Sequence, residues 1–362
     1  MPYPLIRPAA RRSLAQVRYI GHIPPAAATG PVAAVYEETE KEFGVLAPPV
    51  AMHAPQPALL AAAWTMLRET LVAEGTMDRA QKEAVAAAVS AANSCPYCVE
   101  VHGSVLNTLV PGSHLPGQDT RRALPSGELR RLAEWATGPR GGQRSPAPAP
   151  GQLPEALGVA VVFHYLNRMV NVFLEPSPLP ARIPGAARGP ASRLFAAVLA
   201  RGARAHREPG RSLGLLPPAA LPGDFGWAGA RPTVADAFAR AAKAIATAGE
   251  NTVPVSVRTL VTEELSGWDG TPKPLVPDWL NKAESQLPPE DRPAGRLALL
   301  TAFASYRVDE TVIAPVLHSG SGDASLLTLV AWSAFTAARR HGALLVPPSE
   351  PATATPEEPA SL

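Results

Sequence analysis

The residues best suited to chemistry lie close together, between positions 83 and 102. The string C-P-Y-C-V-E-V-H runs from Cys95 to His102. If this string is helical, Cys95 and Cys98 share one face, because residues three apart are neighbours on a helix. His102 follows Cys98 by four residues and lies one turn further along that face. These residues predict two-cysteine thiol redox chemistry, in which the imidazole takes the thiol proton and later returns it.

The segment N-S-C-P, residues 93–96, predicts a helix break followed by a new helix. Pro96 fits the first helical position, so Ser94 or Cys95 would be the N-cap. The unpaired N–H groups and the positive end of the helix dipole lower the pKa of a thiol placed there. The N-cap position favours Cys95 as the reactive thiolate, whereas proximity to His102 favours Cys98. The sequence does not decide which of the two cysteines is the reactive thiolate.

Glu83 joins this group only if the chain reverses at the break. On one continuous helix it would lie about 18 Å from Cys95, at about 1.5 Å per residue. A reversal at Asn93 and Ser94 makes the two helices antiparallel. Glu83 precedes Asn93 by ten residues and His102 follows it by nine, so the two side chains come level. We therefore expect Glu83 to orient His102 and to raise its basicity.

Most of the chain has a helical pattern, and no segment shows convincing strand alternation. The sequence therefore predicts an all-α fold. A proline-rich stretch at 175–190 predicts a boundary between two halves. Helices are expected at 31–43, 57–75, 78–92, 96–109, 155–174, 191–206, 233–248, 254–266, 290–306, 308–317 and 323–345.

A weak internal repeat relates residues 78–106 to residues 291–317. Both begin with Asp-Arg, continue as an apolar helix, break, and resume as a helix that ends in Val-Leu. We interpret this as two similar halves packed as a pseudo-dimer, although any two Ala/Leu-rich hairpins share such features. An ungapped alignment pairs Glu83 with Arg296, Cys95 with Val308, Cys98 with Thr311 and His102 with Pro315. The expected domains are an irregular arm (1–30), a redox domain (31–185), a cysteine-free half (190–346) and a disordered tail (347–362).

Composition argues against several classes of function. The formal net charge is +2 and no block of like charges occurs, so no nucleic-acid partner is expected. The most apolar stretch, 156–174, is interrupted by polar residues, so no membrane association is expected. The two cysteines are too close in sequence for a disulfide between them to hold distant parts of the fold together. This favours a location of the protein in the reducing cytoplasm. Four polar residues in the helix at 155–174 need partners and are expected at an interface or a pocket: His164, Tyr165, Asn167 and Arg168.

The motif resembles that of the AhpD-like alkylhydroperoxidase family, within the larger carboxymuconolactone decarboxylase group. The family pattern is E, eleven residues, C-x-x-C, three residues, H, and this chain meets every spacing with Glu83, Cys95, Cys98 and His102. Other similar features are E-F-G at 42–44, Trp64, and S-A-A-N-S-C-P-Y-C at 90–98. The resemblance spans roughly residues 31–175, about 40% of the chain.

The resemblance implies an all-α fold and a cysteine pair that alternates between dithiol and disulfide. It implies reduction of a hydroperoxide or of a partner peroxiredoxin, with electrons from a dithiol such as lipoamide. It also implies a Glu83–His102 proton relay, self-association as a homo-oligomer, and no cofactor. Tyr97 stands where well-known members have a second histidine, which puts a three-base relay in doubt. Tyr97 and Asn93 are candidate relay or pocket residues.

Other interpretations remain open at this point. Cys95, Cys98 and His102 offer only three zinc ligands, whereas a structural site needs four, so no metal is expected. The cysteines could be an inert buried pair. The protein could be a non-enzymatic redox sensor or assembly protein. A cofactor-free lyase of the decarboxylase branch is disfavoured, since that branch lacks the C-x-x-C pair.

Overall fold

The structure is a computed structural model that describes residues 13–110, 124, 127–138, 145–180 and 183–347. Its regular structure within these ranges is helical, and two residues, Val17 and Leu174, form an isolated antiparallel bridge. The prediction of an all-α fold is therefore confirmed. Part of the expected arm (1–12) and nearly all of the expected disordered tail (348–362) lie outside the described residues.

Helices of the first half surround one buried helix, α8. Capping signals account for several ends. Asp78 forms a capping box with Gln81 at the start of α5, and Gly44 ends α2 in the left-handed conformation, with φ of 98°. The elements are α2 (Gly30–Phe43), α3 (Pro48–Ala51), α4 (Pro57–Leu67), a π-helical turn η3 (Arg68–Val72), α5 (Arg79–Ala92), α6 (Pro96–Leu109), α7 (Gly127–Ala136), α8 (Leu153–Phe173) and α9 (Gly185–Ala203).

Helix α8 is apolar because protein covers it. By length and composition it is the one described helix that could cross a membrane, yet 94% of its apolar window is buried inside the molecule. It packs against α5 and α4 of its own half and against α15 of the other half. Its apolar character is therefore explained by packing in the core.

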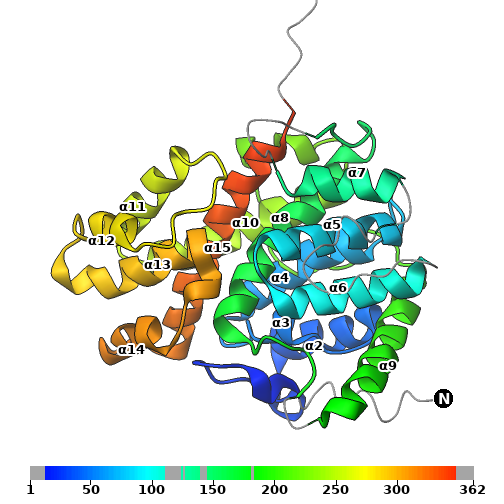
Figure 1. Cartoon of the computed structure of the whole chain (residues 1–362), viewed down its shortest axis with the longest axis horizontal. Helices are drawn as coiled ribbons and strands as arrows, with labels where there is room; N and C mark the ends of the chain where they lie inside the picture. The colour runs from blue at the N-terminus through cyan, green and yellow to red at the C-terminus, as the bar shows by residue number, and fades with distance from the viewer. Residues whose placement is uncertain (1–12, 111–123, 125–126, 139–144, 181–182, 348–362) are drawn as a thin grey trace, which may run out of the picture.

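The second half is also helical and packs on the first through two long helices (Figure 1). Helix α15 lies along α8, and α10 lies along α4. Helices α11 to α14 form the side of the molecule away from α6 and α9. The elements are α10 (Pro232–Thr252), α11 (Val255–Ser266), α12 (Asp278–Glu284), α13 (Arg292–Ala304), α14 (Glu310–His318) and α15 (Asp323–Leu345).

The order of elements is similar in the two halves: the hairpin α5–α6 is followed by α7 and then α8, and the hairpin α13–α14 is followed by α15. That the halves are duplicates, with the predicted domain limits, stays a prediction. One difference concerns α9, which the boundary at 175–190 assigns to the second half but which packs on α2 and α6. A Cβ at Gly202 would lie 2.8 Å from the Phe43 carbonyl oxygen, so glycine permits this close approach. The sequence also did not predict α7 or the short helices α3 and α12.

Candidate redox site

The chain reverses direction at Asn93–Cys95, as the sequence predicts. Asn93 is the C-cap of α5, Ser94 has a φ of 51°, and Cys95 is the N-cap of α6. The Cys95 amide donates to the Ser90 carbonyl oxygen at 3.0 Å, which ties the turn to the end of α5. Pro96 occupies the first turn of α6, where a missing N–H costs no hydrogen bond. Helices α5 and α6 then pack against each other.

This reversal brings Glu83 and His102 into direct contact. His102 Nδ1 donates to Glu83 Oε2 at 2.7 Å, and Arg79 Nε donates to Glu83 Oε1 at 2.8 Å. Because the carboxylate only accepts, Nδ1 carries a proton and Nε2 is left as the basic nitrogen. Burial pushes the pKa of Glu83 upward, but Arg79 and His102 outweigh it and hold the pKa below its usual value. The predicted contact is confirmed, and His102 is oriented by an ionised carboxylate.

The two cysteines are close together and buried, and the structure has no bond between them. Cys98 lines a cavity together with His102, whereas Cys95 is fully buried and is not part of the cavity wall. The pKa of Cys98 is raised by burial and by its hydrogen bond to Cys95, and a hydrogen bond from Asn167 opposes both effects. Ionisation of the Cys98 thiol therefore requires a base that accepts its proton and groups that stabilise the thiolate.

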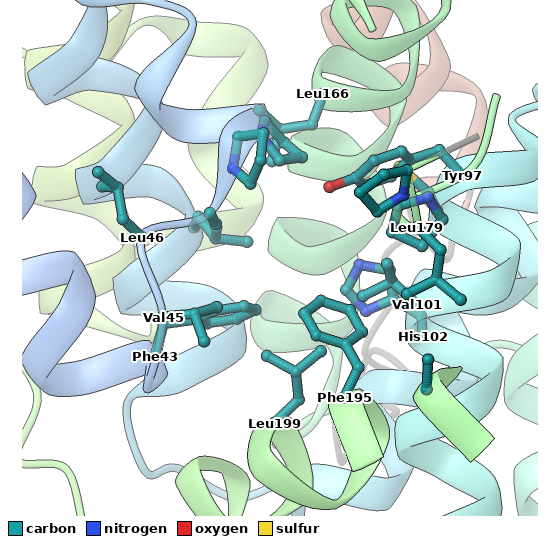
Figure 2. Close-up of a pocket in the computed structure, with 18 of the residues that line it drawn as sticks. Phe43, Val45, Leu46, Tyr97, Val101, His102, Leu166, Leu179, Phe195 and Leu199 are labelled. Carbon is teal, nitrogen blue, oxygen red and sulfur yellow. The ribbon is translucent and has the colours of Figure 1, made fainter. Parts of the chain in front are cut away.

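The cavity beside Cys98 has a volume of about 320 Å³ and an apolar wall. Figure 2 shows Phe43, Val45 and Leu46 opposite Tyr97 and His102, with Phe195 and Leu199 of α9 closing one side. None of the described lining residues carries a carboxylate, an ammonium or a guanidinium group. The polar groups there are the Cys98 thiol, the His102 imidazole and the Tyr97 hydroxyl, whose pKa is raised by burial.

Of the two candidate relay or pocket residues, Tyr97 lines the cavity and Asn93 does not. Asn93 instead lies in a polar cluster behind the cysteines, where its amide contacts Asn167 at 3.0 Å and His164 at 3.1 Å. The walls formed by α9 and by residues 43–46 were not predicted. The E-F-G string at 42–44 was their one sequence signal.

Two of the four polar residues singled out on α8, Arg168 and His164, find partners in the second half, while Asn167 bonds Ser90 and Asn93 of the first half. Arg168 donates to the Ala302 carbonyl oxygen at 3.1 Å and to His341 Nε2 at 2.9 Å. His164 stacks on His341, with ring centroids 3.7 Å apart. Burial and the nearby Arg168 lower the pKa of His164 well below its usual value, so the ring is neutral. Tyr165 instead contacts His53, its hydroxyl 2.8 Å from Nε2.

Among the residues that the structure describes, no group of three His, Cys, Asp or Glu side chains is arranged to hold a metal ion. Comparison with known proteins gives two findings. The sequence profile of the carboxymuconolactone decarboxylase family matches residues 58–106, which include Glu83, both cysteines and His102. A protein of Mycobacterium tuberculosis (strain ATCC 25618 / H37Rv) named alkyl hydroperoxide reductase is 38% identical over 343 residues, which cover 90% of this chain and 95% of the relative.

Proposed function

The chain belongs to the carboxymuconolactone decarboxylase family, and from that premise we propose that it is a thiol-dependent peroxidase. Its relative's name, alkyl hydroperoxide reductase, supports a peroxidase-like activity. The observation that carries the proposal is that Cys98 and His102 line one apolar cavity while His102 hydrogen-bonds Glu83 at 2.7 Å. A thiol, an oriented base and a space for substrate are the parts that such a reaction needs.

The first chemical step is attack of Cys98 on the peroxide. His102 Nε2 takes the thiol proton, and the Cys98 thiolate attacks the terminal oxygen of a hydroperoxide R–O–OH. An S–O bond forms and the O–O bond breaks, so Cys98 becomes a sulfenic acid and the alkoxide RO⁻ leaves. The imidazolium returns its proton to the alkoxide, which gives the alcohol. Glu83 stabilises the imidazolium between these two transfers.

The second step closes the disulfide. The Cys95 sulfur attacks the Cys98 sulfenic acid, an S–S bond forms, and the hydroxyl leaves as water with the Cys95 proton. Two electrons have then passed from the dithiol to the peroxide. An external dithiol such as dihydrolipoamide restores both thiols by exchange through a mixed disulfide and is itself oxidised to a disulfide.

The cavity favours an organic hydroperoxide with an apolar group. Its wall consists mainly of aliphatic and aromatic side chains, which gain little from contact with hydrogen peroxide. A recessed cavity also fits a small molecule better than it fits the surface of a partner peroxiredoxin. That the protein is cytoplasmic and forms a homo-oligomer remains a prediction.

The decisive experiment is a cumene hydroperoxide assay with dihydrolipoamide as reductant. The wild-type protein should turn over, and Cys98→Ser should lose at least about a thousandfold in rate. Without the reductant, Cys95→Ser should reduce one equivalent of peroxide and stop at the Cys98 sulfenic acid, which a dimedone probe traps. Activity that persists in Cys98→Ser contradicts the proposal.

The same variants separate the alternative functions. A redox sensor would form the disulfide once without sustained turnover by dihydrolipoamide. A lyase of the decarboxylase branch would survive the double change Cys95→Ser with Cys98→Ser. The absence of a charged side chain among the described lining residues disfavours a substrate with several carboxylates.

A further inference from the structure

A line of buried amides connects Cys98 to a guanidinium on the same central helix. Asn167 of α8 hydrogen-bonds the Cys98 thiol. Its Oδ1 accepts from Asn93 Nδ2 at 3.0 Å, and Asn93 Oδ1 accepts from Arg168 at 3.3 Å. Asn167 and Arg168 are buried, and Asn93 is half-buried at the end of α5. These residues reach Cys98 from the polar cluster behind the cysteines. They are separate from the Glu83–His102 pair.

The direction of every amide in this line is fixed by its neighbours. Arg168 can only donate, so the Asn93 oxygen faces it and the Asn93 nitrogen faces Asn167. At the other end the Ser90 hydroxyl donates to the Ala86 carbonyl oxygen at 2.7 Å, so it accepts from Asn167 Nδ2 at 3.1 Å. The nitrogen of Asn167 therefore lies on the side of Ser90 and Cys98. All the N–H dipoles run from the guanidinium toward the sulfur.

Arg168 has no neighbouring negative charge to neutralise it. Among the described residues, no carboxylate lies within ion-pair distance of this guanidinium, although it is buried. Its other partners are neutral: the carbonyl oxygens of His164 and Ala302 and the ring of His341. A buried and uncompensated cation polarises the hydrogen bonds that it donates and stabilises an anion at their far end.

We propose that Arg168, Asn93 and Asn167 stabilise the Cys98 thiolate, and that the second half of the chain holds Arg168 in place for this purpose through Ala302 and His341. The inference rests on the proposed role of Cys98 as the residue that attacks the peroxide. The site then has two parts: Glu83 and His102 accept the thiol proton, and the amide line holds the anion that remains. Asn93 and Arg168 are positioning residues, and Asn167 contacts the reacting sulfur.

Other charged and titratable groups lie on the helices around Cys98 and must be kept constant in a test. From α5 these groups are Glu83 and Arg79, and from α6 they are Cys95, Tyr97, Glu100 and His102. From α8 and α15 they are His164 and His341, whose rings are neutral because burial lowers the pKa of each well below its usual value. All variants below share one Cys95→Ser background, and apart from the control they alter only Arg168, Asn93 or Asn167.

The test is the pH dependence of Cys98 alkylation by iodoacetamide, measured in a Cys95→Ser background. We expect Arg168→Met and Asn167→Ala to raise the apparent pKa of Cys98 by about one unit, so that alkylation at pH 7 slows about tenfold. Arg168→Lys keeps the charge and should recover part of that loss. Because alkylation needs no peroxide, this result is independent of whether the protein turns over hydroperoxide.

The matched control is Asn171→Ala, one turn further along α8. Asn171 donates to the Asn93 carbonyl oxygen at 3.1 Å and to Ser305 at 3.0 Å, so it touches the same turn and the same half but lies outside the line. Its alkylation profile should match that of the Cys95→Ser parent. If Arg168→Met fails to fold, Asn93→Ala interrupts the line at a half-buried position. Unchanged profiles in folded line variants, or an equal shift in Asn171→Ala, overturn the proposal.

Discussion

The hairpins α5–α6 and α13–α14 have the same order of elements but begin their second helix differently. In the first hairpin Cys95 is the N-cap of α6 and its side chain caps no backbone N–H. In the second hairpin Asp309 is the N-cap of α14, and its carboxylate accepts from the Thr311 amide at 3.0 Å. The second hairpin thus satisfies its helix end with a side chain, whereas the first places a thiol there.

The first helices of the two hairpins differ in the same sense. Glu83 is 1% exposed and bonds His102 and Arg79 inside the protein. Its aligned counterpart, Arg296, forms an ion pair with Glu284 at the surface, at 2.8 Å. A surface pair of this kind contributes little to stability, whereas a buried carboxylate is costly unless it is fully paired. The first hairpin therefore accepts a buried charge that the second avoids.

The strongest test of this comparison changes the two aligned positions to the same residue. Glu83→Gln should lower the rate of peroxide reduction about a hundredfold, because His102 loses the anion that stabilises its protonated form. Arg296→Gln should leave the rate within about twofold, since it removes only a partly exposed ion pair away from the candidate site. Steady-state assays of both variants provide the measurement. Similar losses in both would show that the hairpins do not differ in function.

Acid stability gives the next largest difference. The pKa of Glu83 is lowered on folding, because Arg79 and His102 outweigh the effect of burial. The stability it contributes is therefore fully present above the ordinary carboxyl pKa of 4.5 and is lost as the pH falls through the lower folded value. Chemical denaturation of wild type and Glu83→Gln should show a gap at pH 7 that narrows toward pH 3. A gap that stays constant with pH would rule out this linkage.

The caps predict a smaller effect, a loss of stability in the second hairpin that the first should not show. Asp309→Ala should lower the free energy of unfolding by about 1 kcal/mol, because the Thr311 amide loses its acceptor. Cys95→Ser should not lower it, because a serine hydroxyl at an N-cap can accept from the backbone. Denaturant midpoints measured on reduced protein check both values. If both changes destabilise equally, α6 must be capped by something other than the residue at 95.

The smallest effect concerns the disulfide that only the first hairpin can form. Because two residues separate the cysteines, the ring is very small and restricts the unfolded chain little. Reduction should therefore change the melting temperature only slightly. Calorimetry of the oxidised protein with and without a reductant is the measurement. A large drop on reduction would point to a structural disulfide.

Local patterns in the sequence were sufficient to predict most helices, the chain reversal and the Glu83–His102 contact of the candidate site. The helix break at 93–96 predicted the reversal, and counting from Asn93 predicted the contact between Glu83 and His102 at 2.7 Å. Both rest on neighbouring residues and on helix geometry. The polar residues of α8 were also expected to have partners, because polar groups buried in an apolar helix need hydrogen bonds.

The rest of the site depends on distant segments that no local pattern brings together. Phe43 and Phe195 line one cavity although 152 positions separate them in the sequence. The assignment of α9 to the second half followed from proline content alone, whereas its packing on α6 is decided in three dimensions. His341 had no partner that could be identified from sequence, because Arg168 lies in the other half.

The packing of α15 along α8 has a consequence for how the protein can be produced. A fragment ending after α9 would expose to water the apolar face of α8 that α15 covers, together with Arg168. Such a fragment should aggregate when it is expressed by itself. Co-expression with the remainder, split within residues 204–231, should instead yield a soluble two-piece protein. Each piece would then cover the apolar surface that the other exposes when it is alone.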